Sequence, residues 1–284
     1  MAATAAVREF HYRLGVPAAG VLPGHHRSRA GSSGFEFRAH ATLADAPDAR
    51  RLDLHASLRD PYGRWLVRLN SERKAITVAA VADLSASMGF EGTVRRLDVL
   101  ADFVGSLAHS AWRHGDAFAF VGCDDAPHAG VLLPATRRRG AGAALAQALR
   151  TRVPRGQAGA ALLQAHRHLP SRRSLVFLVS DFLLPPVEVD RTLASLAAHV
   201  VVPVVLRDRA EFALGAPYGL APVVEPESGR TAWLWWRPAL RERWAEAAAA
   251  RQAALAAVFR RHRVAPLVIE GAFDADAVTR HFAA

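Results

Sequence analysis

Three side chains with oxygen atoms stand at alternate positions directly after an apolar run. Asp83, Ser85 and Ser87 follow residues 76–82, a short segment with β-branched residues that predicts a strand buried on both faces of a parallel sheet. Alternate spacing on a turn lets the carboxylate and the two hydroxyls face one point. Because hard cations such as Mg²⁺ take oxygen ligands, the turn is a candidate magnesium site.

The same turn also has a purely structural interpretation. Asp and Ser are common turn residues, and at the start of a helix their side chains accept hydrogen bonds from backbone amides. Asp83 and Ser85 would then only cap the following helix. The pattern by itself does not decide between the two interpretations, so both stay open.

The remaining periodicities predict an α/β fold. Strand-like and helix-like segments alternate from residue 75 onward, which favours a mostly parallel sheet flanked by helices. Residues 117–122 and 130–133 predict an antiparallel edge hairpin, and residues 222–225 and 231–235 predict a second hairpin. Further strands are expected at 174–180, 199–206 and 266–269, and helices at 97–112, 141–150, 159–169, 188–198, 238–263 and 274–282.

Residues 1–74 do not continue this alternation. They contain short extended pieces separated by Gly-rich and Pro-containing turns, which predict an irregular, β-rich module. We therefore expect two domains, a lead-in module at 1–74 and an α/β domain at 75–284.

Tryptophans gather near the second predicted hairpin and the long helix after it. Alternation places Trp233 and Trp235 on one face of a strand, close in sequence to Trp236 and Trp244. We expect the pair to pack in the core between the hairpin and the helix. An exposed pair would instead indicate a protein interface.

Composition narrows the function classes. Half of the 284 residues are hydrophobic (51%), which excludes global disorder, and no run is long enough for a membrane span. The net charge of +10 comes from scattered arginines without the aromatic–basic interleaving of an RNA-binding sheet, so we expect no nucleic-acid partner. The first residues lack the apolar stretch of a signal peptide, and the single cysteine, Cys123, fits a reducing compartment, so we expect a cytoplasmic protein.

Two stretches carry a resemblance to known families. Asp83-Leu84-Ser85-Ala86-Ser87 resembles the Asp-x-Ser-x-Ser signature of the metal-ion-dependent adhesion site of von Willebrand factor A domains, and Asp181, after the strand at 174–180, resembles the later aspartate of that site. The lead-in is similar to that of the DUF58 family, in which it precedes a von Willebrand A-like domain. The matching segments are Pro23-Gly24-His25-His26-Arg27-Ser28, Gly34-Phe35-Glu36-Phe37 and residues 48–59.

The resemblance covers residues 20–282 and implies a von Willebrand A-like, Rossmann-like fold. Leu-Arg-Asp-Pro at 58–61 is similar to the branch encoded beside methanol-oxidation genes. The implied metal ligands are Asp83, Ser85, Ser87 and Asp181.

One feature departs from the family's metal site. Its usual threonine is replaced by Arg155-Gly156-Gln157-Ala158-Gly159, so we expect weak or no magnesium affinity, with Gln157 or a water as a substitute oxygen. Arg155 and Gln157 are candidate contacts to a partner protein on the same rim.

The resemblance also implies a function. Related proteins act as adaptors that bind a partner at this edge and work with MoxR-type AAA+ ATPases in maturing a target enzyme, sometimes with metal insertion. The chain has no P-loop sequence and no Gly-x-Ser-x-Gly elbow, and we expect no catalytic residues. The alternative is a metal-dependent hydrolase that uses Asp83 and Asp181, which would need a general base and a substrate pocket.

Overall fold

The computed structural model describes residues 7–14, 23–27, 36–71, 73–124, 131–211, 218–224 and 230–283. The chain forms two compact units. The larger one combines Met1–Arg13 with Thr77–Ala284, and the smaller one is Leu14–Ile76.

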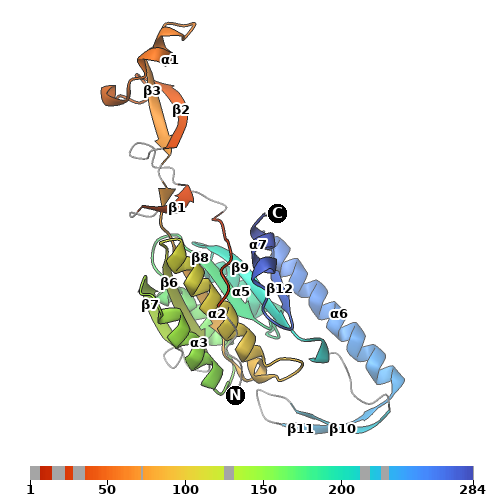
Figure 1. Ribbon diagram of the computed structural model, residues 1–284. Coiled ribbons are helices and arrows are strands. Elements are labelled where there is room, and N and C mark those ends of the chain that lie inside the picture. Colours follow the sequence, from red (N-terminus) through yellow and green to blue (C-terminus); the bar gives the residue numbers. More distant parts are fainter. Residues whose placement is uncertain are drawn as a thin grey trace. The chain divides into compact units, whose positions relative to one another are not determined.

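A six-stranded sheet forms the centre of the larger unit, in the order β12-β9-β8-β5-β6-β7 (Figure 1). All neighbouring pairs are parallel except β6 and β7, which are antiparallel. The mostly parallel sheet, the central position of the strand before Asp83 and the antiparallel edge hairpin are therefore confirmed, although residues 125–129 of the expected turn at 123–129 lie outside the described residues. The strands are β5 (Thr77–Asp83), β6 (Ala117–Cys123), β7 (Leu132–Thr136), β8 (Leu175–Ser180), β9 (Val200–Arg207) and β12 (Leu267–Glu270).

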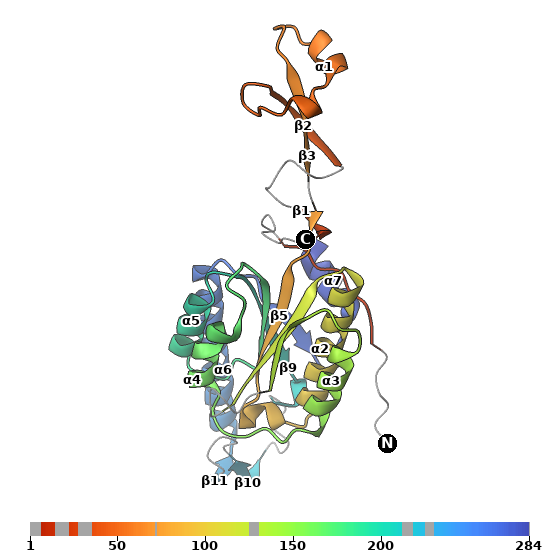
Figure 2. The ribbon, with the colours of Figure 1, turned by 90° about the vertical axis from the view of Figure 1, so that its left-hand side faces the viewer.

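Helices cover both faces of this sheet (Figure 2). One layer contains α2 (Arg96–Arg113), α3 (Ala141–Thr151) and α7 (Ala275–Ala283), and the other contains α4 (Gly159–Gln164), α5 (Pro186–Ser195) and α6 (Pro238–Arg261). Short 3₁₀ turns complete the connections at η2 (Ala86–Gly89), η3 (Ala165–His168) and η4 (Arg209–Glu211).

The central strand shows why this arrangement is stable. Side chains alternate across a strand, so Ala79 and Val81 belong to the cluster formed with α4, α5 and α6, while Val78 and Ala80 face the opposite layer. All four are fully buried. A strand covered on both faces in this way leaves only its ends available for chemistry.

The N-terminal segment lies along α2 rather than with the residues that follow it. The Phe10 amide donates to Ser110 Oγ at 3.0 Å, the Phe10 ring stacks on Phe103 with centroids 6.1 Å apart, and the Tyr12 hydroxyl donates to Asp116 at 2.7 Å. This differs from the expected lead-in module at 1–74, because Met1–Arg13 groups with the sheet. Two aromatic side chains anchor the segment, too few to produce a recognisable period in the sequence.

The smaller unit contains two short antiparallel pairs, in agreement with its predicted β-rich character. β1 (Pro23–Arg27) pairs with β4 (Arg73–Lys74), and β2 (Glu36–Thr42) pairs with β3 (Leu66–Ser71). Between β2 and β3 lie η1 (Ala49–Arg51) and α1 (Leu54–Leu58). Asp53 caps α1 by accepting from the Ala56 amide at 3.1 Å and also accepts from Arg68 Nε at 2.7 Å. The glycine-rich piece at 31–34 lies outside the described residues.

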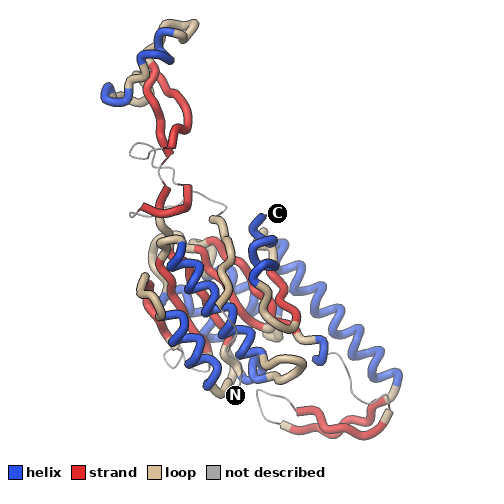
Figure 3. Tube along the Cα trace, in the orientation of Figure 1, coloured by secondary structure: helices blue, strands red, loops and turns tan. Residues whose placement is uncertain are grey.

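A separate hairpin leads into α6 (Figure 3). β10 (Gly219–Val224) pairs with β11 (Thr231–Trp236), and residues 227–229 of the expected turn at 227–230 lie outside the described residues. The expectation that Trp233 and Trp235 are core residues is wrong, because they are 65% and 54% exposed. Trp236 instead is buried and meets Trp244 of α6 edge to face. Strand alternation allows only one face of the hairpin to pack, and the face of Trp236 is the one that does.

Candidate functional site

The carboxyl ends of β5 and β8 bring together the residues of the Asp83 turn. The Ser85 amide and hydroxyl both donate to Asp83 Oδ1, at 2.9 and 2.6 Å, and Ser85 Oγ lies 3.2 Å from Ser87 Oγ. All three residues are buried. The structure therefore gathers Asp83, Ser85 and Ser87 around one point, as their alternate spacing predicted.

Ser180 closes this cluster from the neighbouring strand. Its hydroxyl donates to Asp83 Oδ2 at 2.7 Å and accepts from the Phe182 amide at 2.8 Å. Phe182 has a φ of 53°, a left-handed conformation that is uncommon for a residue with a large side chain. Ser180 thus holds both the carboxylate and the turn that carries Asp181. Sequence reasoning did not include Ser180 in the site, although it directly precedes Asp181.

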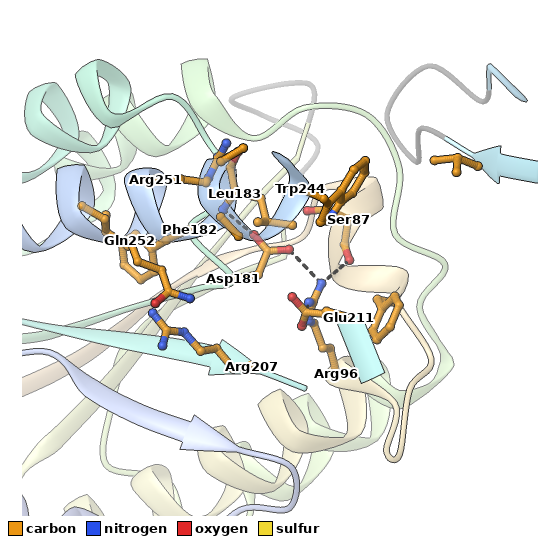
Figure 4. Close-up of a pocket in the computed structure, with 15 residues that line it drawn as sticks. Ser87, Arg96, Asp181, Phe182, Leu183, Arg207, Glu211, Trp244, Arg251 and Gln252 are labelled. Atoms are coloured by element: carbon orange, nitrogen blue, oxygen red, sulfur yellow. Dashed lines mark hydrogen bonds and ion pairs between the residues drawn. The ribbon is translucent and has the colours of Figure 1, made fainter. Parts of the chain in front are cut away.

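Asp181 is bound by an arginine instead of standing free. Arg96, the first residue of α2, donates from one guanidinium nitrogen to Asp181 Oδ2 at 2.9 Å and to the Ser87 carbonyl at 2.8 Å (Figure 4). Its other terminal nitrogen is bonded to Glu211. The Arg96 side chain is 4% exposed, so this is a buried ion-pair network. Sequence reasoning missed both Arg96 and Glu211.

The two aspartates of the site have different electrostatic environments. Burial, together with the negative charge of Asp181, raises the pKa of Asp83 above its usual range, and the hydrogen bonds from Ser85 and Ser180 oppose this shift. Among the described residues, no basic side chain lies within ion-pair distance of Asp83, whereas Asp181 has Arg96. The single guanidinium therefore compensates the outer carboxylate but not the inner one.

The arrangement does not fit a divalent cation as it stands. The Asp83 oxygens already accept three hydrogen bonds, and Asp181 is engaged by the permanent positive charge of Arg96. A magnesium ion bound by both aspartates would lie next to the positively charged guanidinium, so Arg96 would have to move away from Asp181. Within the described ranges, no group of three or more His, Cys, Asp or Glu side chains is placed to hold a metal.

The loop expected to complete the rim lies next to the Asp83 turn. The Gly156 carbonyl accepts from the Ala86 amide at 3.0 Å, which fixes the loop against the turn. Arg155 and Gln157 are exposed on either side of Gly156. They are accessible to a partner protein, and their role as contacts stays a prediction.

A pocket of about 580 Å³ opens beside Asp181, between the sheet edge and α6 (Figure 4). Ser87, Arg96 and Asp181 line it on one side, and Trp244 and other residues of α6 line it on the other. Sequence reasoning identified no pocket. Its location at the carboxyl edge is where open α/β sheets bind ligands.

In the part of the chain that the structure describes, no helix combines the length and the apolar character that a membrane span requires.

Comparisons with known proteins agree with the sequence resemblance. A family model described as "Protein of unknown function DUF58" matches residues 45–254. A protein of Paracoccus denitrificans, described as an uncharacterized protein in the moxR 3′ region, is 39% identical over 101 residues, which are 36% of this chain and 96% of that protein.

Solved structures give weaker similarities. The conserved hypothetical protein BatB from Bacteroides thetaiotaomicron aligns over 74% of this chain and 98% of its own, with 13% identity and a TM-score of 0.45. The VWA domain of SpRpn10 aligns over 72% of this chain and 95% of its own, with 15% identity and a TM-score of 0.42. The fold assignment therefore rests on the strand order and helix layers described above.

Proposed function

We propose that this chain, which belongs to the DUF58 family, is an adaptor without enzymatic activity that binds a partner protein at the carboxyl edge of its sheet. The partner in this proposal is a MoxR-type AAA+ ATPase, and the pair acts in the maturation or metal insertion of a target enzyme. Support for the ATPase comes from the Paracoccus relative, whose description places it in the moxR 3′ region.

The pocket beside Asp181 is the observation that carries the binding role. Its volume of about 580 Å³ is within the range of ligand-binding pockets, and it is already open at the edge where ligands bind in this class of sheet. Among the described residues that line it, there is no His, Cys or Lys that could act as a nucleophile or base, and the two carboxylates, Asp181 and Glu211, are held by Arg96. These residues favour recognition over catalysis.

The alternative function is a metal-dependent hydrolase that uses Asp83 and Asp181. It would require Arg96 to leave Asp181 and Glu211, which would expose two carboxylates in a buried setting without their cation. The position of Arg96 therefore supports the adaptor over the hydrolase.

The proposal is tested with the full chain and the MoxR-type ATPase encoded in the same genome. Gel filtration and fluorescence titration, each with ATP and with a non-hydrolysable analogue, should show a complex in at least one nucleotide state. No complex in either state would contradict the adaptor role. Magnesium-dependent hydrolysis of phosphoesters or peptides by the purified chain, lost in Asp83→Asn, would support the alternative instead.

A further inference from the structure

One face of α6 forms a trough along the pocket. The pocket is lined by Trp244, Ala247, Ala248, Arg251, Gln252 and Leu255 of this helix. They follow the i, i+3, i+4, i+7, i+8, i+11 pattern, which places side chains along one face of a helix. Trp244 and Leu255 are large, while the two alanines between them end at Cβ. The missing side-chain volume in the middle of this face is what keeps the trough open.

The opposite wall is also largely apolar. Phe182 and Leu183 follow Asp181 on the turn after β8, and Val223 of the β10–β11 hairpin adds a further aliphatic side chain. Trp244 and Leu183 remain 40% and 43% exposed. An apolar side chain that entered between Trp244 and Leu183 would therefore cover surface that the chain itself leaves accessible to water, which is favourable in proportion to the area removed from water.

Two arginines of the pocket have no carboxylate partner in the described part of the chain. Arg207, the last residue of β9, lines the pocket without an ion pair (Figure 4). Glu270, which lies opposite it on β12, forms its ion pair with Arg209 at 2.8 Å, and the hydrogen bond from Arg209 lowers the pKa of Glu270, with a smaller contribution from the charge of Arg207. Arg251 donates only to main-chain carbonyls, those of Leu183 and Leu184. The pocket lining therefore carries three arginines, Arg96, Arg207 and Arg251, against two carboxylates, Asp181 and Glu211, and both carboxylates are bonded to Arg96. The lining has a net charge of +1, and its excess positive charge lies at Arg207 and Arg251.

We propose that the trough between α6 and the sheet edge binds an acidic, amphipathic segment of a partner protein. In this complex a large apolar side chain of the segment lies over Ala247 and Ala248, between Trp244 and Leu183, and a neighbouring carboxylate pairs with Arg207. Charge complementarity selects the occupant, because a carboxylate in a partly desolvated site gains from the arginines and a basic segment is repelled. The inference rests on the proposed adaptor function and names the chemistry that the adaptor recognises.

The probes are two matched peptides, acetyl-Phe-Glu-Leu-amide and acetyl-Phe-Gln-Leu-amide, titrated into the full chain by calorimetry. The glutamate peptide should bind at least tenfold more tightly than the glutamine peptide. Arg207→Met should abolish this preference while leaving the affinity for the glutamine peptide unchanged. Ala248→Leu, which fills the trough with another good helix former, should remove the binding of both peptides.

Arg172→Met serves as the control, because Arg172 is an exposed arginine at the opposite, amino-terminal edge of β8. Equal affinities for the two peptides, an unchanged preference in Arg207→Met, or no binding of either peptide at millimolar concentration would each overturn the inference.

The same variants separate this inference from the adaptor function itself. If Ala248→Leu still captures the MoxR-type ATPase with wild-type affinity, the trough is not the recognition site and the adaptor function stands. If the glutamate peptide binds as expected but the wild-type chain never captures the ATPase, the trough stands and the proposed function fails.

Discussion

The carboxyl edge of the sheet has two halves whose charged residues differ in their state of pairing. In the Asp83 half, which comprises Asp83, Ser85, Ser87, Ser180 and Asp181, the carboxylates accept hydrogen bonds from serines or from Arg96. In the α6 half, which comprises the trough with Arg207 and Arg251, neither arginine forms an ion pair with a carboxylate of the described residues. The state of pairing therefore distinguishes a cluster that holds the fold together from one that is available to a partner.

The largest loss of stability is expected when the Asp83 half loses the guanidinium of Arg96. Arg96→Met would leave Asp181 and Glu211 with uncompensated charge in a buried site, and we expect a loss of about 3–5 kcal/mol in the free energy of unfolding. Urea unfolding monitored by circular dichroism measures this. In the α6 half, Arg207→Met should change the free energy of unfolding by less than about 0.5 kcal/mol. Similar losses of unfolding free energy in Arg96→Met and Arg207→Met would show that the two halves do not differ in their contribution to stability.

A smaller loss is expected from the serine that joins β8 to the Asp83 turn. Ser180→Ala removes the donor to Asp83 Oδ2 and the acceptor of the Phe182 amide. Leaving these two buried groups without partners should cost about 1–3 kcal/mol, measured in the same unfolding experiment. Ser171→Ala, at an exposed position, is the matched control and should be neutral. An unchanged midpoint in Ser180→Ala would show that the Asp83 half is not a coupled network.

The smallest stability effect is expected from magnesium. Because Arg96 already binds Asp181, millimolar Mg²⁺ should leave the melting temperature of the wild-type chain unchanged within error. A ligand present at its own dissociation constant would add only about 0.4 kcal/mol of stability. A shift of several degrees in the melting temperature that disappears in Asp83→Asn would instead identify a metal site. It would contradict the expectation that the ion pair between Arg96 and Asp181 prevents magnesium binding.

Regular periodicity explains which parts of the fold were predictable. The apolar run before Asp83 predicted a central strand because a strand buried on both faces needs no alternation, and β5 is such a strand. The convergence of Asp83, Ser85 and Ser87 followed from their spacing on one turn. These are local properties, and the sequence contains them directly.

The rest of the site depends on contacts between residues far apart in the chain. Arg96 and Asp181 are 85 positions apart, and in a chain with arginines throughout nothing distinguishes Arg96 from its neighbours. Ala247 and Ala248 predict only a helix, since the space above them depends on what the sheet edge places opposite. Alternation placed Trp233 and Trp235 on the same face, but it could not indicate that this face is the exposed one.

The central claim is that the α6 half, and not the Asp83 half, recognises the partner. The most direct test is the affinity of the full chain for the MoxR-type ATPase, measured by fluorescence titration for wild type, Arg207→Met and the matched control Arg172→Met. We expect Arg207→Met to weaken binding at least tenfold while its melting temperature stays close to that of the wild type, and Arg172→Met to bind like the wild type. Equal affinities for all three proteins would contradict the account.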